Sequence, residues 1–187
     1  MKVSGFTFIR NAITLDYPVV ESIQSILPLC DEVVVAVGNS EDQTLELIQN
    51  IAPKVKVIQT IWDDTLRANG AVLALETDKA LAAIDPEADW AFYIQGDEVI
   101  HEADHPAILA ALHKYQHDHE VDGLLFNYLH FYGSYDYVGI SNNWYKKEIR
   151  IIKPGRQIRS YRDAQGFRKA PDQKLKVAAI DARVFHY

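Results

Sequence analysis

The sequence predicts an α/β protein in three layers, with helices on both faces of a mostly parallel central sheet. In residues 1–100, short apolar runs rich in β-branched side chains alternate with segments of helical periodicity, which is the pattern of right-handed β-α-β crossovers. After residue 100 the alternation gives way to longer strand-like runs separated by polar and tyrosine-rich segments. The second half is therefore expected to add strands of mixed direction to the same sheet.

The elements of the first half follow from the spacing of apolar residues. Four runs are apolar on both faces, as in strands buried within a parallel sheet, and they are expected as strands at Val3–Ile9, Glu32–Val37, Val55–Gln59 and 90–94. Helical spacing between them predicts helices at 15–27, 44–51 and 66–84. Ser40-Glu41-Asp42-Gln43 resembles a capping box, which marks the start of the second of these helices.

The second half is predicted with less regular alternation. Residues 105–117 are expected to form a helix, and 122–131, 148–153 and 177–185 are expected to form strands. Residues 132–143 are rich in Gly, Ser, Asn and Tyr and predict a loop or hairpin, and the basic segment 156–174 is expected to be irregular. Both halves are expected to share one sheet within a single domain, because 187 residues suffice for one sizeable core.

Composition excludes several classes of protein. The net charge of −7 does not favour nucleic-acid binding. A single cysteine, Cys30, excludes an internal disulfide framework and a zinc site built from several thiolates. No apolar stretch has the length of a membrane span, and the start of the chain is a poor secretory signal. The expected location is the cytoplasm.

Residues 90–98 read Trp-Ala-Phe-Tyr-Ile-Gln-Gly-Asp-Glu and form the most informative segment of the chain. A predicted buried strand ends there at two carboxylates, Asp97 and Glu98. In open α/β sheets ligands bind beyond the carboxyl ends of the strands, and a hard divalent cation prefers oxygen ligands. The alternative is that the pair begins a helix, since acidic residues are common in a first helical turn.

Three motifs in this order resemble glycosyltransferase family 2, which has the Rossmann-like GT-A fold. Asn39-Ser40-Glu41-Asp42-Gln43-Thr44 stands where the family has Asp-Gly-Ser-x-Asp-x-Thr. Arg67-Ala68-Asn69-Gly70 stands where a helix opens before the acidic motif, and Gln95-Gly96-Asp97-Glu98 stands at the Asp-x-Asp metal motif. The resemblance covers residues 1–100 well. Beyond them it depends on the stretch 144–150 and on His186.

The resemblance implies a site for Mg²⁺ or Mn²⁺. Family members hold the metal through the last Asp of the motif, here Asp97, although Gln95 replaces the first Asp. A histidine after the final strand often adds a ligand, and here that is His186; the alternative is that His186 only ends a strand. An end at Tyr187 is then expected for a chain shortened at its C-terminus or for an unusually short enzyme.

The activity that the resemblance implies is metal-dependent transfer of a sugar from a nucleotide-diphosphate sugar to an acceptor hydroxyl, with inversion. Residues 1–100 would bind the donor and residues 101–187 would face a saccharide or lipid-linked acceptor, as in synthesis of surface polysaccharides or glycolipids. The family's paired acids that recognise uracil are replaced by Val37 and Gly38, which leaves the base open.

Further site residues are expected in two groups. Donor contacts are expected from Arg10, Asn11, Asp42, Arg67, Gln95 and Glu98. For four of them there is an alternative: an ordinary ion pair for Arg10, a helix start for Asp42, a solvated helix face for Arg67 and a turn cap for Glu98. The catalytic base, a carboxylate that takes the acceptor proton, is expected at Asp163 or Asp136, with Glu148 as a third candidate.

Two other functions compete with this one. A nucleotidyltransferase has a related sheet, but the segment 8–12, Phe-Ile-Arg-Asn-Ala, lacks the glycine-rich loop that such enzymes carry after the first strand. A non-catalytic domain that binds a nucleotide sugar or serves as a scaffold agrees with Gln95 and with the missing copy of the family's Glu-Asp base motif.

Overall fold

The structure is a computed structural model that describes residues 1–66, 70–141 and 144–187. Its strands are β1 (Val3–Ile9), β2 (Glu32–Val37), β3 (Val55–Gln59), β4 (Trp90–Tyr93), β5 (Glu98–Ile100), β6 (Gly123–His130), β7 (Lys147–Ile152), β8 (Ile158–Tyr161), β9 (Gly166–Lys169) and β10 (Val177–His186). Its α-helices are α1 (Val19–Ile26), α2 (Thr44–Gln49), α3 (Ala71–Ala82) and α4 (His105–Tyr115), with 3₁₀ turns at Leu27–Leu29, Asp64–Leu66 and Glu102–Asp104.

One sheet of eight strands runs through both halves of the described chain, in the order β3-β2-β1-β4-β7-β6-β10-β5. The strands β3, β2, β1 and β4 are parallel, β7 is antiparallel to both of its neighbours, and β10 is parallel to β6. Strand β5 pairs antiparallel with β10 at the edge. The carboxyl ends of the parallel strands and of β6 and β10 therefore meet at one edge of the sheet.

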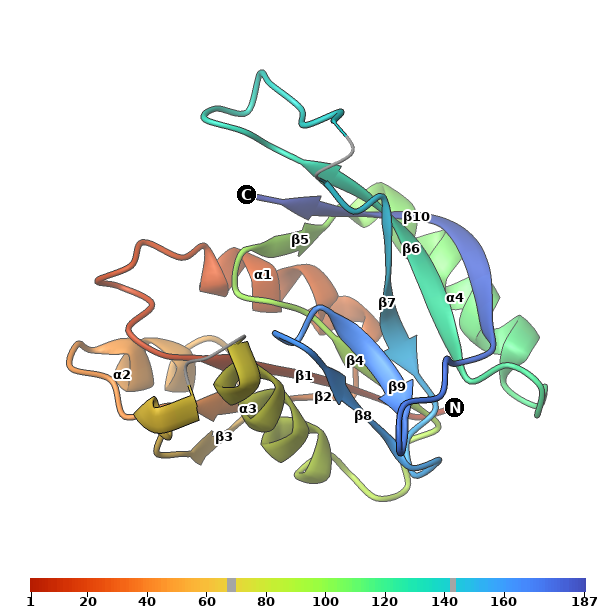
Figure 1. Ribbon diagram of the computed structural model, residues 1–187, viewed down its shortest axis with the longest axis horizontal. Coiled ribbons are helices and arrows are strands. Elements are labelled where there is room, and N and C mark those ends of the chain that lie inside the picture. Colours follow the sequence, from red (N-terminus) through yellow and green to blue (C-terminus); the bar gives the residue numbers. More distant parts are fainter. Residues whose placement is uncertain (67–69, 142–143) are drawn as a thin grey trace.

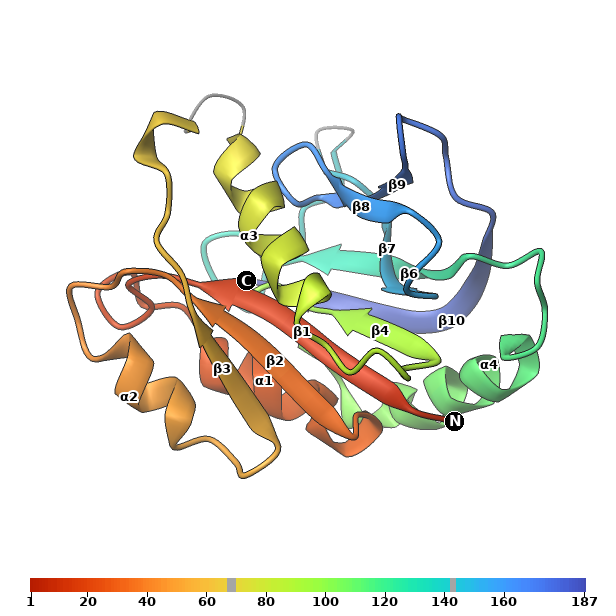
Figure 2. The ribbon, with the colours of Figure 1, turned by 90° about the horizontal axis from the view of Figure 1, so that it is seen from below.

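Helices cover both faces of this sheet (Figure 2). On one face lie α1, α2 and α4, which share an apolar core with the sheet around Trp90 and Phe92. On the other face lie α3 and the two-stranded β8–β9 hairpin, with a second core around Phe6 and Tyr93. The prediction of a three-layer α/β fold with a mostly parallel sheet is confirmed, because apolar side chains on both faces of β1, β2 and β4 require cover on both sides.

The two halves differ in how well their elements were predicted. Strands β1, β2 and β3 have the predicted bounds, and β4 is one residue shorter. The basic segment 156–174, expected to be irregular, instead contains the β8–β9 hairpin. Its anchor is Phe167, which packs edge-on against Phe6 and Tyr93 beneath α3. A single buried aromatic residue in a polar segment gives no periodic signal, and this is why the hairpin was missed.

The structure also excludes one of the two predictions made for the acidic pair Asp97-Glu98. Residues 98–100 form strand β5 and not the first turn of a helix, so the alternative of a helix start at Asp97-Glu98 is wrong. The cause is β10, which pairs with residues 98–100 and orders them as strand. None of the helices in the described part of the chain has the length and apolarity needed to cross a bilayer.

Candidate donor and metal site

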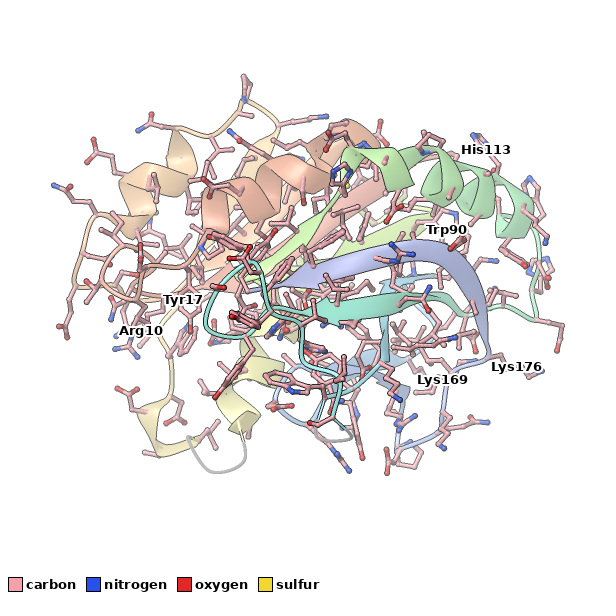
Figure 3. The ribbon with its side chains drawn as sticks, turned by 90° about the horizontal axis from the view of Figure 1, so that it is seen from above. Arg10, Tyr17, Trp90, His113, Lys169 and Lys176 are labelled. Carbon is pink, nitrogen blue, oxygen red and sulfur yellow. The ribbon has the colours of Figure 1, made fainter. Side chains whose placement is uncertain are left out.

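A cleft of about 480 Å³ opens at the edge where the parallel strands end. Its lining comes from the carboxyl ends of β1 and β4 and from the segments that follow β3 and β1, and it includes Arg10, Asn11, Trp62, Gln95 and Asp97. In Figure 3, Arg10 and Tyr17 lie together at this end of the molecule, and Trp90 and His113 lie toward the other end. This is the edge at which ligands bind in open α/β sheets.

Asp97 and His186 meet beside this cleft. The Nε2 atom of His186 lies 3.7 Å from Oδ2 of Asp97. The cause is strand pairing: His186 is opposite Glu98 in the β5–β10 ladder, and the Tyr187 amide donates to the Asp97 carbonyl at 2.9 Å. A histidine 89 positions further along the chain is thus held against the acidic motif by main-chain hydrogen bonds.

The Asp97 carboxyl group lies in an environment suited to a cation. Burial and the neighbouring charge of Glu98 raise the pKa of Asp97, and His186 opposes that rise. No third side chain of this kind joins Asp97 and His186, since within the described residues no cluster of three or more His, Cys, Asp or Glu side chains is placed to hold a metal. A carboxylate and an imidazole are ligands that Mn²⁺ and Mg²⁺ accept, with phosphate oxygens or water completing the coordination. The donor set therefore fits a divalent cation shared with a phosphorylated ligand.

Glu98 lies behind the cleft in a buried ion pair. Arg150 donates from Nε to Oε2 of Glu98 at 2.9 Å and from Nη2 to Oε1 at 2.6 Å, and the Tyr128 hydroxyl donates to Oε1 at 2.7 Å. Burial works against the charge, but Arg150 and Tyr128 outweigh it and keep the pKa of Glu98 below its usual range. Both carboxylate oxygens have protein partners, so the side chain faces the core and not the cleft.

Gln95 connects the two sides of the site. Its side chain lines the cleft and also a second hollow of about 550 Å³ that contains Asp163, Gln165 and His186. Its backbone amide donates to Oε2 of Glu98 at 3.1 Å, which fixes the turn before Asp97. The amide side chain at this position offers one donor and one acceptor group where a second metal-binding carboxylate was expected from the resemblance.

One side of the cleft, here called the Trp62 side, is formed by Phe8, Arg10 and Trp62. The Arg10 guanidinium lies 5.7 Å from the centre of the Trp62 ring and pairs with Asp64 at 3.1 Å. The rings of Phe8 and Trp62 pack with centroids 5.8 Å apart. The ion pair suggested as an alternative for Arg10 is present, and the residue also lines the cleft, so the structure agrees with both interpretations.

Gly38 allows Trp62 to approach the end of β2. A Cβ atom at residue 38 would lie 2.4 Å from Nε1 of Trp62. We expect Gly38→Ala to push the indole outward and to lower the free energy of unfolding by about 1–3 kcal/mol, the usual cost of overpacking, as measured by urea denaturation. In a double-mutant cycle Trp62→Phe should recover part of this loss, because the smaller ring leaves room for the methyl group. Additive losses would show that the contact is not the cause.

Asn11 and Asp42 order the loops around the Trp62 side. The backbone of Asn11 has a φ of 54°. Its side-chain oxygen accepts a hydrogen bond from the backbone amide of Glu41 at 2.8 Å, and its backbone amide donates to the Ser40 hydroxyl at 3.0 Å. Asp42 accepts the Thr14 amide at 2.9 Å and the Thr44 amide at 3.0 Å. Burial opposes ionisation, but a hydrogen bond from the Thr44 hydroxyl, together with these two amides, lowers the pKa of Asp42 to about 2.

The arrangement around Asp42 supports the helix-start interpretation. From one position before the N-cap residue Gln43, its carboxylate accepts the amide of Thr44, the first residue of α2, a donor that has no partner within the helix. Asp42 is not among the residues that line the cleft, whereas Asn11 and Glu41 are. Arg67, the remaining predicted donor contact, lies outside the described residues.

The second hollow, here called the far side, contains one of the two candidate bases. Asp163 lines it together with Gln95, Trp144, Tyr145 and His186. Asp136 instead lies in the exposed segment 131–141, which projects beyond the carboxyl ends of β6 and β10 (Figure 1), where its amide donates to Ser134. The structure brings Asp163, and not Asp136, to the hollow beside the acidic motif.

Three residues of the site were not singled out as site residues in the sequence. Trp62 follows β3 in a segment without periodicity, and Arg150 lies within the predicted strand 148–153, where the sequence does not show which residue a charged side chain would pair with. Tyr128 lies in β6 among other aromatic residues. Arg150 carried one signal, because it is the charged residue in the apolar run Ile149–Ile152 of β7. A charge in such a run usually has a buried partner.

No protein-family model matches the chain, and no curated protein gives a significant match. Solved structures do match, with probability 1.00. S. aureus TarS aligns at 23% identity and a TM-score of 0.53 over 76% of this chain and 23% of TarS. Residues 1–349 of TarS align at 21% identity and a TM-score of 0.52, over 76% of this chain and 39% of that one. The same fragment with UDP-GlcNAc gives 23% identity and 0.53, over 76% and 37%.

These matches establish the fold. The chain has a GT-A-type, Rossmann-like α/β fold, similar to that of TarS. It spans less than two fifths of the length of the TarS chains that it matches.

Proposed function

We propose that this protein is a metal-dependent, family-2-like glycosyltransferase that uses a nucleotide-diphosphate sugar. The observation that supports this most directly is the pairing of Asp97 and His186 at 3.7 Å between two hollows of the same edge. One hollow offers an aromatic and guanidinium surface for a nucleoside, and the other offers a carboxylate and aromatic rings for an acceptor. The pattern of the motifs along the sequence agrees with this arrangement.

The donor is proposed to lie with its nucleoside against Arg10 and Trp62. An aromatic ring and a guanidinium offer a stacking surface and hydrogen-bond donors to base and phosphate. Asn11 and Gln95 border the same cleft and offer amide groups to the ribose or the sugar. The solved structures of TarS with UDP and with UDP-GlcNAc make a uridine donor the first one to test.

Asp97 and His186 are proposed to hold Mg²⁺ or Mn²⁺ against the diphosphate. When bound, such an ion acts as a Lewis acid for the negative charge that develops on the leaving group. The protein's own part is to hold the carboxylate and the imidazole in place by the pairing of β5 with β10. The raised pKa of Asp97 agrees with a carboxylate that gains from a nearby cation.

Asp163 is proposed as the catalytic base. In the reaction the acceptor hydroxyl oxygen forms a bond to the anomeric carbon as the bond from that carbon to the diphosphate oxygen breaks. The bonding electron pair leaves with the nucleoside diphosphate, and the acceptor proton passes to a carboxylate. Inversion requires the base on the face opposite the diphosphate. Asp163 lies in the far-side hollow, which shares Gln95 with the cleft proposed for the donor, and this fits the requirement.

The acceptor is proposed to be a saccharide, free or lipid-linked. Trp144 and Tyr145 line the far-side hollow, and such rings offer flat apolar faces to a sugar together with polar groups at their edges. A cytoplasmic location and a role in surface polysaccharide or glycolipid synthesis accompany this proposal.

Calorimetric titration tests the donor site. UDP and GDP are titrated into the wild-type protein in Mn²⁺ and then in EDTA. We expect UDP to bind in Mn²⁺ and to bind more weakly in EDTA, because Asp97 and His186 would hold a cation that offsets the negative charge of the diphosphate. Transfer or hydrolysis of the donor would then exclude a non-catalytic binding domain. Failure of UDP and GDP to bind under either condition would contradict the proposal.

His186→Ala tests the second metal ligand. We expect the affinity for UDP in Mn²⁺ to fall about tenfold or more, the scale found when groups around a metal are removed, while the affinity in EDTA stays the same. The control is His113→Ala on the exposed surface of α4, at the far end of the molecule (Figure 3). An unchanged Mn²⁺-dependent affinity in His186→Ala would mean that this histidine only ends β10.

A further inference from the structure

The Glu98–Arg150 pair is the most deeply buried ion pair in the described part of the chain. The side chain of Arg150 is 1% exposed and that of Glu98 is 0% exposed. The guanidinium also lies between two rings, 5.1 Å from the centre of Tyr93 and 5.2 Å from that of Tyr128. Neither side chain lines the cleft, so the reaction proposed above does not use the pair directly.

Stability alone does not explain such a pair. Removing two charges from water is expensive, and apolar residues of similar volume often stabilise a core as well or better. Apolar groups are already present on this side of the sheet, since Tyr93, which flanks the guanidinium, is fully buried in one core with Phe167 and Ile152. The value of the pair therefore lies in what its remaining hydrogen-bonding groups hold.

Those groups hold both sides of the site. On the donor side, Glu98 accepts the Gln95 amide at 3.1 Å, and Asp97 lies between these two residues. On the far side, Nη1 of Arg150 donates to the Gln165 carbonyl at 2.8 Å. Gln165 follows the proposed base, Asp163, by two residues. The two segments also contact each other directly, but this hydrogen bond, from Nε2 of Gln95 to the Ala164 carbonyl, is longer, at 3.4 Å.

We propose that Arg150 is a positioning residue that fixes the Gln95–Asp97 turn and the loop 163–165 relative to each other. The ion pair is rigid because the guanidinium is planar and binds the carboxylate with two nitrogens. Through Glu98 it sets the place of the metal-binding carboxylate, and through Gln165 it sets the place of the base. This inference rests on the proposed function for the roles of Asp97 and Asp163, while the structural coupling is independent of it.

The test is Arg150→Lys, which keeps the charge but loses the planar fork. Hydrogen–deuterium exchange is followed in peptides that cover residues 95–98 and 162–166, and UDP affinity is measured in Mn²⁺. We expect faster exchange in both peptides and a loss of affinity of about 10- to 100-fold, the range for residues that orient metal ligands. The milder variant Tyr128→Phe, which removes one hydrogen bond to Glu98, should shift both readouts less and in the same direction.

Lys153→Met is the matched control. Lys153 is also a buried cation at the end of β7, but it donates to the carbonyls of Tyr115 and Asp118 at the opposite end of the sheet. We expect this variant to lose stability without faster exchange at residues 95–98 or 162–166 and without loss of UDP affinity. It separates a general loss of stability from a local loss of position.

The outcomes distinguish this inference from the proposed function. If Arg150→Lys and Tyr128→Phe leave exchange at both peptides unchanged, the coupling is wrong, whatever nucleotide binds. Unchanged UDP affinity despite faster exchange would overturn the role in the site. If the wild type binds no nucleotide, the proposed function fails, and the exchange data alone decide whether Arg150 holds the two segments together.

Discussion

Replacement of Asp97 by asparagine is expected to abolish Mn²⁺-dependent nucleotide binding. Asparagine has the same shape but no negative charge, so it removes the carboxylate that faces His186 at 3.7 Å. Changes to groups that only orient metal ligands already cost about 10- to 100-fold, so the loss for a ligand itself should reach or exceed about 100-fold. Titration of UDP in Mn²⁺ measures the effect, and titration in EDTA should show no difference from the wild type.

The control for this prediction is Asp16→Asn. Asp16 borders a neighbouring hollow of about 930 Å³ that also reaches Asp97, so it lies close to the site. Its φ of 55° is tolerated by asparagine as well as by aspartate. We expect this variant to bind UDP as the wild type does. If Asp97→Asn also keeps the wild-type affinity in Mn²⁺, the metal is not held at Asp97.

Replacement of Glu98 by glutamine is expected to cause the largest loss of stability. The change leaves the Arg150 guanidinium, which is 1% exposed, without its counter-charge in the core. Breaking a buried ion pair by removing one charge costs about 3–5 kcal/mol, because the remaining charge stays desolvated. Urea denaturation at pH 7 measures the effect.

The Glu98–Arg150 pair also predicts how the difference in stability between the wild type and Glu98→Gln changes with pH. In the folded protein Arg150 and Tyr128 overcome burial and hold the pKa of Glu98 below the usual value of 4.5. The unfolded chain therefore takes up this proton at higher pH than the folded protein does. The stability from the pair is fully present above about pH 4.5 and is lost as the pH falls through the lower pKa of the folded state. The gap between wild type and Glu98→Gln should narrow over that acid range.

Glu120→Gln serves as the control for both measurements. Glu120 pairs with Lys176 on the surface, where both side chains are more than half exposed. Solvent screens such pairs, so no resolved loss of stability is expected. If Glu98→Gln is as mild as this variant, the buried pair does not have the energetic role assigned to it.

The sequence predicted the first half of the fold because its signals are local. Strands β1, β2 and β3 are short apolar runs with polar boundaries, and their observed bounds match the predicted ones. Strand β5 was missed because the strand with which it pairs among the described residues is β10, 84 to 88 positions further along the chain. Three residues carry too little periodicity to be recognised without that partner.

The site was predictable where strand ends carry polar residues. Arg10, Asn11, Gln95 and Asp97 line one cleft because β1 and β4 end at the same edge of the sheet. The network of Glu98 could not be predicted, since no local pattern shows that Arg150 of β7 points toward it. Glu98 was expected to contact the sugar or cap a turn. Its carboxylate binds Arg150 and Tyr128, and it also accepts the Gln95 amide in the turn before Asp97.

The place of β10 in the sheet has a consequence for biosynthesis. In the described part of the chain, strand β5 joins the sheet through β10, which follows β1 to β9 along the sequence. A nascent chain on the ribosome that has emerged as far as β9 can form the parallel half, whose contacts are more local. Its acidic motif then has neither the β5–β10 ladder nor His186. The pairing of Asp97 with His186 thus forms only when β10 joins the sheet, so a chain that ends before β10 would lack one of the two proposed metal ligands.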